Sequence, residues 1–303
     1  MKKFLRCAVV TVMAAVLLVS QASAFNYWDN GYILAADGKT RMAMPKPYTC
    51  EEVVYELEGS TKNSFSNPRD LFLAPSGEYY VADTGNKRIV RLSNDFKFIA
   101  EYDGGGIFNS PEGIYVTDGG DMYVADSSDS RIVHLDPEGV YVEEFIMPES
   151  ELLYNVTTFA PSKVAINPVN NYLYVVQGKQ FMTIDAVNNF KGYVGANRVA
   201  FNLINYIVMT FATDEQKDQM TAVEPAAYYN FCVANGGKIY ATGAEKKKRI
   251  SVINTVGENI FPEEEYGETI YDDNGYKRTP VFVDICADEN EIISVIEQNT
   301  CCI

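Results

Sequence analysis

Residues 68–102 decide the fold, and they read Pro-Arg-Asp-Leu-Phe-Leu-Ala-Pro, Ser-Gly-Glu, Tyr-Tyr-Val-Ala-Asp, Thr-Gly-Asn-Lys, Arg-Ile-Val-Arg-Leu, Ser-Asn-Asp-Phe and Lys-Phe-Ile-Ala-Glu-Tyr. Four runs in this stretch are short and rich in β-branched and aromatic residues, and clusters of Gly, Asn, Asp and Ser separate them. Such runs are typical of β-strands, and such clusters are typical of tight turns. The stretch therefore predicts four short strands joined by turns.

The same pattern returns in residues 111–145, where Asp126 follows Asp83 by 43 residues. Three looser units begin near residues 161, 229 and 280. A four-stranded unit that recurs at this period is the mark of a β-propeller, in which each unit forms one blade. An all-β propeller is therefore the predicted fold.

Two copies of one motif carry a resemblance to a known family. The first copy is Val81-Ala82-Asp83, Gly85-Asn86 and Arg88-Ile89, and the second is Val124-Ala125-Asp126 and Arg131-Ile132. In these residues the chain resembles the NHL-repeat family, although Asp129 stands where the first copy has Asn86. The resemblance implies an NHL-type propeller, with six blades in the complete protein. Because the fifth unit stops after two strands, we predict a propeller truncated in its fifth blade, with residues 53–57 as a closing strand.

Residues 25–303 are expected to form this propeller, with a helical insertion between blades three and four at about residues 197–222. Residues 199–212 are largely apolar, and Thr213-Asp-Glu-Gln216 matches a capping box, which marks the start of a helix. The apolar run is shorter than the roughly 20 residues that cross a bilayer. The insertion therefore predicts helices packed on the propeller rather than a membrane span.

Residues 1–24 have the parts of a bacterial secretory signal peptide, which are a basic head, an apolar core and the small residues Ala22-Ser23-Ala24. Their removal leaves 22 basic and 41 acidic residues and a formal net charge of −19, against −16 for the whole chain. An acidic surface repels nucleic acid and suits a secreted or cell-surface protein. No membrane contact is expected after cleavage, and a membrane segment beyond residue 303 is the alternative for an anchored form.

The Asp and Arg of the repeated motif are interpreted as architecture rather than chemistry. Asp83 and Asp126 stand at the start of a tight turn, where a carboxylate accepts backbone N–H groups, and Arg88 and Arg131 follow within reach. Residues that recur at the blade period build the blade, so no catalytic role is predicted for them.

A candidate ligand site comes from aligning the innermost strand of each unit, because the first residues of this strand border the central channel of a propeller. The aligned positions differ in chemistry, and they hold Asp70, Gly113, Lys163, Asn230 and Asp284. Asp70, Asn230 and Asp284 offer oxygen donors for Ca²⁺ or another hard divalent cation, and such a site would be similar to that of gluconolactonase-like six-bladed hydrolases. Lys163 would oppose a cation in this ring. The alternatives are a polar ligand-binding mouth without a cofactor, formed by Asp70, Lys163, Asn230 and Asp284, and polar strand ends that line a water-filled channel.

Cysteine and histidine add no strong catalytic pattern. Cys232 and Cys286 occupy equivalent inner-strand positions in neighbouring units, and two small buried thiols explain them more simply than the alternative, a disulfide. His134 is the single histidine and lies in the third strand of the second unit. Neither a Gly-x-Ser-x-Gly elbow nor a glycine-rich phosphate loop occurs in the sequence, so we expect His134 to be a strand residue on a blade face.

The sequence predicts an exported, non-catalytic propeller that recognises a protein, a glycan or a small ligand through its blade loops. Two alternatives stay open. One is a metal-dependent, lactonase-like or lyase-like enzyme at the channel mouth, and the other is the structural ectodomain of a membrane-anchored protein. No nucleic-acid partner is expected, because the chain lacks a basic face.

Overall fold

In the computed structural model, the described residues are 53–150, 153, 156–178, 180–194, 228–234, 236–245, 248–262, 279–288 and 290–298, together with the backbone of two strands nearer the N-terminus. The chain divides into two compact units, residues 1–53 and 54–303. In the first unit, β1 (Tyr32–Leu34) pairs antiparallel with β2 (Arg41–Ala43).

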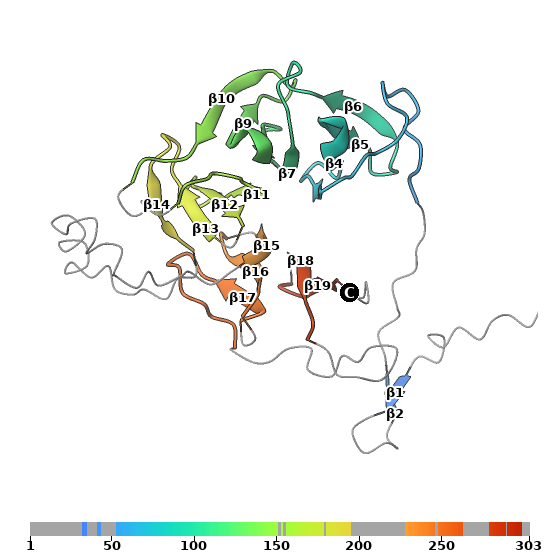
Figure 1. Cartoon of the computed structure of the whole chain (residues 1–303). Coiled ribbons are helices and arrows are strands. Elements are labelled where there is room, and N and C mark those ends of the chain that lie inside the picture. Colours follow the sequence, from blue (N-terminus) through green and yellow to red (C-terminus); the bar gives the residue numbers. More distant parts are fainter. Residues whose placement is uncertain are drawn as a thin grey trace, which may run out of the picture. The chain divides into compact units, whose positions relative to one another are not determined.

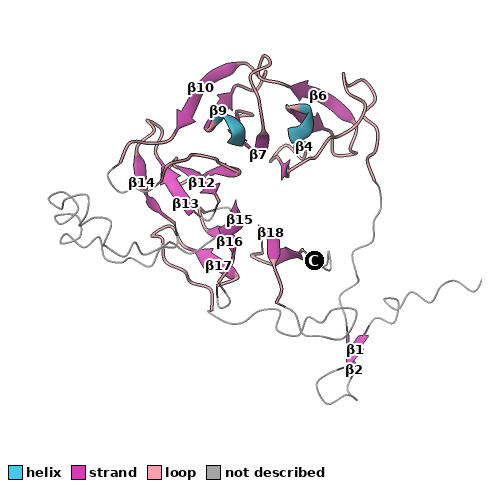
Figure 2. Cartoon of the chain, viewed as in Figure 1, coloured by secondary structure: helices cyan, strands magenta, loops and turns pink. Residues whose placement is uncertain are grey.

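The described part of the second unit contains five antiparallel sheets, in which each strand pairs with the next strand of the chain (Figure 2). Sheet 1 holds β3 (Asp70–Leu73), β4 (Tyr79–Asp83), β5 (Arg88–Leu92) and β6 (Phe98–Tyr102). Sheet 2 holds β7 (Pro111–Val116), β8 (Met122–Asp126), β9 (Arg131–Leu135) and β10 (Tyr141–Ile146). Sheet 3 holds β11 (Lys163–Ile166), β12 (Leu173–Gln177), β13 (Gln180–Ile184) and β14 (Phe190–Tyr193). Sheet 4 holds β15 (Tyr228–Val233), β16 (Ile239–Gly243) and β17 (Ile250–Ile253), and sheet 5 holds β18 (Phe282–Ala287) and β19 (Ile293–Glu297).

The sheets of the second unit are arranged as the blades of a propeller. Their first strands contact one another in chain order, from β3 through β7, β11 and β15 to β18. In Figure 1 the sheets succeed one another around an axis, and the labelled first strands β7, β11, β15 and β18 lie toward it. This arrangement confirms the predicted all-β propeller, while the number of six blades stays a prediction.

Each pair of neighbouring sheets shares a hydrophobic core, because alternate side chains of a strand point to opposite faces of its sheet. Val124 of β8 packs in the core between sheets 1 and 2, and the next residue, Ala125, packs in the core between sheets 2 and 3. Similar cores lie between sheets 3 and 4 and between sheets 4 and 5. Burial of one large apolar side chain contributes about 1.5–3 kcal/mol, so stacking stabilises every blade through its neighbours.

Residues 53–57 do not form the predicted closing strand. Leu57 is buried instead in a small core on sheet 1 with Val81, Val90 and Leu92, and its backbone N–H donates to Asn63 O at 2.8 Å. The segment therefore packs on a sheet face through a turn rather than pairing along an edge. The predicted signal peptide and the helical insertion at 197–222 lie outside the described residues. Among the described residues, no helix has the length and apolar character needed to cross a bilayer.

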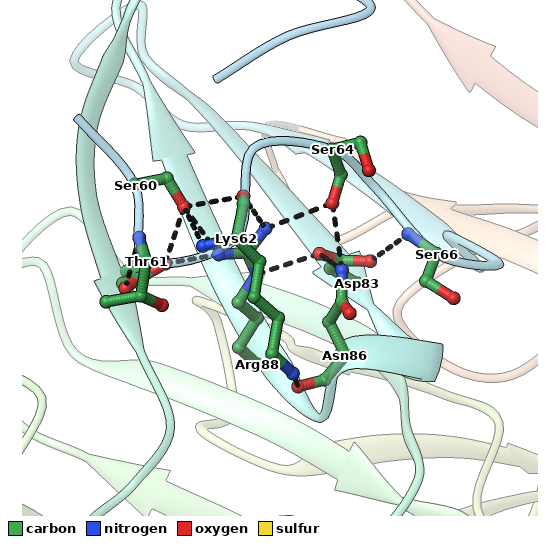
Figure 3. Close-up of polar contacts among 9 residues, drawn as sticks. Ser60, Thr61, Lys62, Ser64, Ser66, Asp83, Asn86 and Arg88 are labelled. Carbon is green, nitrogen blue, oxygen red and sulfur yellow. Dashed lines mark hydrogen bonds and ion pairs between the residues drawn. The ribbon is translucent and has the colours of Figure 1, made fainter. Parts of the chain in front are cut away.

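The second strand of sheet 1 ends in a buried carboxylate, Asp83, which holds the segment leading into β3 (Figure 3). One oxygen of Asp83 accepts the backbone N–H of Ser66 at 2.7 Å, and the other accepts Asn86 Nδ2 and Arg88 Nε at 2.8 Å each. Arg88 is also buried and donates to four further groups, which are Ser60 Oγ, Lys62 O, Ser64 O and Glu101 Oε2. The buried pair thereby joins residues 60–66 to sheet 1.

We call the last residue of the second strand of a sheet its anchor residue, which is Asp83 in sheet 1. Three other sheets have an anchor residue that makes the same kind of hydrogen bond. It accepts a backbone N–H from the segment leading into its own inner strand, and the pairs are Asp126 with Ser110 at 2.6 Å, Gln177 with Ala160 at 3.0 Å and Glu297 with Val281 at 3.2 Å. In sheet 3, Gln177 Nε2 donates to Gln180 Oε1 at 2.9 Å, so a neutral pair replaces the Asp–Arg ion pair. The third unit therefore keeps the contact although it lacks the motif.

The structure confirms an architectural role for Asp83 and Asp126 and corrects how they perform it. Neither side chain caps the short 3₁₀ helix that follows it, η2 (Thr84–Asn86) or η3 (Ser127–Asp129). Their backbone N–H partners lie 16 or 17 residues earlier in the chain. The carboxylates thus fix the start of the inner strand, and Asp83 also accepts the Asn86 side chain of the turn beside it.

Arg88→Met tests this network, because it removes a buried guanidinium and leaves Asp83 without its ion-pair partner. Breaking a buried pair costs about 3–5 kcal/mol, so we expect a loss of that order in the free energy of unfolding, measured in urea. Arg131→Met is the matched control, since Arg131 is partly exposed and lies 3.5 Å from Asp126. Its loss should be clearly smaller, and equal losses for the two variants would contradict the burial argument.

Candidate functional site

The five aligned inner-strand positions, which we call the inner ring, are structurally equivalent. Each residue is paired with the next-to-last residue of the second strand in its own sheet, and the pairs are Asp70–Ala82, Gly113–Ala125, Lys163–Val176, Asn230–Thr242 and Asp284–Ile296. A register shift immediately precedes Gly113, Asn230 and Asp284, and β-bulges of this kind re-aim a side chain. The alignment made from the sequence is therefore correct in register.

Asp70 and Lys163 form an ion pair between sheets 1 and 3, with Lys163 Nζ 2.5 Å from Asp70 Oδ1. The other oxygen of Asp70 accepts the backbone N–H of Ile114 in sheet 2 at 2.9 Å. The two side chains are only 8% and 15% exposed, respectively. One carboxylate thus joins three sheets. Sequence reasoning missed the Ile114 contact, because a backbone donor leaves no signal in the residue type.

Gly113 allows β7 and β11 to approach closely beside this ion pair. A Cβ atom at Gly113 would lie 2.6 Å from Ser162 O and 2.9 Å from Lys163 Cα. Both distances are shorter than those that real Cβ atoms show, and both involve backbone atoms of the neighbouring chain segment at β11. The neighbouring strand would therefore have to shift its backbone to accept a side chain at Gly113. The glycine in the inner ring is therefore a packing requirement.

Asn230 and Asp284 form a second contact, between sheets 4 and 5. Asn230 Nδ2 donates to Asp284 Oδ1 at 2.8 Å. Each of the two side chains also accepts the backbone N–H of the next residue, from Phe231 at 2.7 Å and from Ile285 at 2.8 Å. These local bonds hold both side chains in place, so their contact is preorganised.

Asp284 carries the perturbed carboxyl group of the inner ring. Burial of the carboxylate is the largest cause and raises its pKa, Lys163 acts in the opposite direction, and Asp70 raises the pKa further. The Coulomb interactions with Lys163 and Asp70 mean that the two contacts of the ring lie within electrostatic range of each other. The residue is nevertheless exposed to solvent, so the carboxylate is accessible from outside.

The three predicted metal ligands take part in two separate contacts. Asp70 is paired with Lys163, and Asn230 is paired with Asp284. Among the residues that the structure describes, no three His, Cys, Asp or Glu side chains are grouped so that they could hold a metal ion. A calcium site at Asp70, Asn230 and Asp284 therefore stays a prediction, and Lys163 would have to leave Asp70 for a cation to take its place.

The two inner-strand cysteines are free thiols, so the disulfide alternative is wrong, and Cys286 is exposed, so the prediction of two buried thiols is wrong for that residue. Cys232 packs in the core between sheets 4 and 5, and burial raises the pKa of its thiol to about 12. Cys286 is exposed, and it alternates along β18 with Ile285 and Ala287, which face that core. Successive strand residues point to opposite faces, which places Cys286 on the far side of the sheet.

His134 belongs to a surface cluster of sheet 2 rather than to the inner ring. Its Nδ1 lies 3.1 Å from Glu143 Oε1, and its Nε2 lies 3.3 Å from Asp121 Oδ1. Its ring stacks on Tyr123, with the ring centroids 4.3 Å apart. His134 is therefore a packed strand residue on a blade face, as expected.

Comparison with known families finds the NHL repeat in residues 108–135. The match covers the segment that leads into β7, the strands β7 and β8, the helix η3 and the strand β9. It therefore includes the anchor residue Asp126 and Arg131 of sheet 2. No curated protein matches the sequence.

Several solved structures are similar to the chain at low identity. Hydrazine synthase of Kuenenia stuttgartiensis is 12% identical with a TM-score of 0.49, and the match covers 80% of this chain and 58% of that chain. A catalytically inactive virginiamycin B lyase from Staphylococcus aureus, with quinupristin, is 16% identical with a TM-score of 0.45, covering 80% and 75% of the two chains. A protein of unknown function from Bacteroides caccae is 14% identical with a TM-score of 0.43, covering 64% and 66%. The chain thus spans less than two thirds of the hydrazine synthase chain.

Gly113→Ala should destabilise the protein, because the new methyl group would meet the backbone of β11. Overpacking of this kind costs about 1–3 kcal/mol, and urea unfolding measures the loss. Gly119→Ala in the same sheet is the control, since its nearest contact would be a side-chain oxygen of Asp121 at 3.2 Å. An unchanged stability for Gly113→Ala would show that the two strands are not tightly packed there.

Asp284→Asn should stabilise the protein at pH 7 and leave it nearly unchanged at pH 3. The raised pKa means that the folded state keeps a proton on Asp284 at pH values where the unfolded chain has lost it. Stability therefore falls as pH rises from the ordinary value of 3.8 through the raised folded value, and the penalty is complete above it. Urea unfolding at the two pH values tests the sign, with Glu138→Gln on an exposed turn as the control. A destabilised Asp284→Asn at pH 7 would refute the assignment.

Proposed function

Because this chain is an NHL-type β-propeller, we propose that it is an exported binding protein without catalytic activity, which takes a protein, glycan or small ligand at the inner ring. The observation that carries the proposal is the gathering of side chains from four sheets into two contacts, Asp70 with Lys163 and Asn230 with Asp284. A site that draws on separate blades forms only in the folded protein. Such convergence of polar groups is the usual basis of ligand orientation.

The contrast between the inner ring and the anchor residues supports this site. The anchor residues of four sheets all make the same kind of contact, a hydrogen bond that holds the segment leading into the inner strand of their own sheet. Inner-ring residues share one backbone register, yet their side chains are acidic, basic, amide or absent. At Asn230 and Asp284 the fold imposes the position but not the chemistry, so the residue types there are free to serve a ligand.

Binding accounts for the described groups better than catalysis does. His134 lies on β9 with its own carboxylate partners, outside the inner ring. The Cys232 thiol is protonated at neutral pH because its pKa is raised to about 12, and the thiolate is the nucleophilic form. Asp284, with its raised pKa, is the one inner-ring group that favours the enzymatic alternative. A hydrolase or lyase of this kind would use Asp284 as its acid or base.

Export is part of the proposal and rests on residues 1–24 and on the acidic composition. A cleavable leader delivers the chain outside the cytoplasm. The excess of acidic residues keeps the exported protein soluble and away from nucleic acid.

Glycan and peptide arrays probed with the full chain test the proposed function. We compare the natural sequence with the double variant Asn230→Ala, Asp284→Asn and with the control Glu138→Gln. Ligands of the inner ring should lose affinity at least about tenfold in the double variant, as expected when charge-assisted hydrogen bonds are removed, and should bind the control unchanged. Mass spectrometry of the recovered ligand should find it intact.

Two results would overturn the proposal. Binding that is equal in all three proteins would place the ligand elsewhere on the propeller. Chemical conversion of the bound ligand by the natural sequence, lost in Asp284→Asn, would make the protein an enzyme.

A further inference from the structure

The inner ring has one carboxylate oxygen left for a ligand. Both described hydrogen bonds of Asp284, from Asn230 Nδ2 and from the Ile285 backbone, go to Oδ1. Within the part of the chain that the structure describes, Oδ2 accepts none. The residue is exposed, so a ligand can approach this oxygen from solvent.

The other charges of the inner ring are already engaged. Asp70 accepts Lys163 Nζ and the Leu71 backbone N–H on one oxygen, and the Ile114 backbone N–H on the other. Lys163 is 15% exposed and 2.5 Å from its carboxylate partner. The ion pair cancels one negative charge with one positive charge, so the ring keeps the single negative charge of Asp284.

We propose that the inner ring binds an organic cation, a ligand that carries an ammonium or amidinium group, through Asp284 Oδ2. This inference rests on the function proposed above and names the class of ligand. An N–H group of the cation would donate a charge-assisted hydrogen bond to the Oδ2 atom of Asp284. The net charge of −16 on the whole chain attracts such a ligand from solution.

The same geometry disfavours an anion and a divalent metal ion as ligands of the inner ring. An anion would meet the free carboxylate of Asp284, and the ammonium of Lys163 that could hold it is already paired. A hard divalent metal ion needs six to eight oxygen ligands for Ca²⁺, whereas the ring offers a single uncommitted carboxylate. A monovalent ammonium group needs only one.

The raised pKa of Asp284 supports the anchoring role that its free oxygen Oδ2 indicates. Its raised pKa reports a carboxylate that protein atoms have partly stripped of water. A bound cation would place a positive charge beside this carboxylate in the folded state. Ligand binding should therefore increase the free energy of unfolding. The coupling has a sign that can be measured, because a ligand that binds the folded state raises its melting temperature.

Putrescine and its neutral isostere 1,4-butanediol provide the test, with the full chain at pH 7 and low salt. Melting temperature and isothermal titration calorimetry are measured for the natural sequence, for Asp284→Asn and for the control Glu138→Gln. Putrescine should bind the natural sequence and the control alike and raise their melting temperatures, and 1,4-butanediol should not. Asp284→Asn keeps the shape of the side chain and should bind putrescine at least about tenfold more weakly. Agmatine, which adds a guanidinium group, and CaCl₂ complete the set of probes.

The outcomes separate this inference from the proposed function. Equal affinity of putrescine for the natural sequence and for Asp284→Asn, or no binding of either amine, would overturn the organic-cation assignment. If array ligands still depend on Asn230 and Asp284 in that case, the binding function stands with a neutral ligand. Binding of Ca²⁺ in preference to the amines, lost in Asp284→Asn, would also overturn it in favour of a metal.

Discussion

The hydrogen bond from a backbone N–H to the anchor residue sets the geometry of four of the five described sheets. A buried N–H group without a partner costs about 1–3 kcal/mol, so the segment that leads into the inner strand is drawn to this side chain. In sheet 1 the bond holds Ser66, four residues before Asp70, and in sheet 2 it holds Ser110, just before β7. In sheets 1, 2, 3 and 5 this contact fixes the starting point of the inner strand, and with it the place of the inner-ring residue.

The anchor contact tolerates a change of side chain because its requirement is simple. Asp83, Asp126, Gln177 and Glu297 all present an oxygen at the end of the second strand. Ionic support is added where a buried Arg88 lies alongside, and it is replaced by an amide pair in sheet 3. The Asp of the recurring motif is therefore one of several side chains that can accept this backbone N–H. The blades without the motif use Gln177 and Glu297 instead.

The inner ring uses its charges in two different ways. Asp70 and Lys163 neutralise each other and join three sheets, which makes them part of the framework. Asn230 positions Asp284 without neutralising it, so an exposed negative charge remains available to a ligand. A framework pair beside a free charge gives the ring both rigidity and a place for a ligand.

Local patterns in the chain were enough to identify the strands, the turns, the propeller and the aligned inner-ring positions, because strand alternation and turn residues act over a few neighbours. They failed for residues 53–57, whose apolar residues suit a strand but pack on a sheet face. They also left Gln177 and Glu297 unnoticed, since only a contact across the sheet reveals that these residues replace Asp83. The pairing of Asp70 with Lys163, and the different exposure of Cys232 and Cys286, were decided by the packing of one blade on another. Distances between blades depend on the stacking of whole sheets, and no spacing along the chain encodes them.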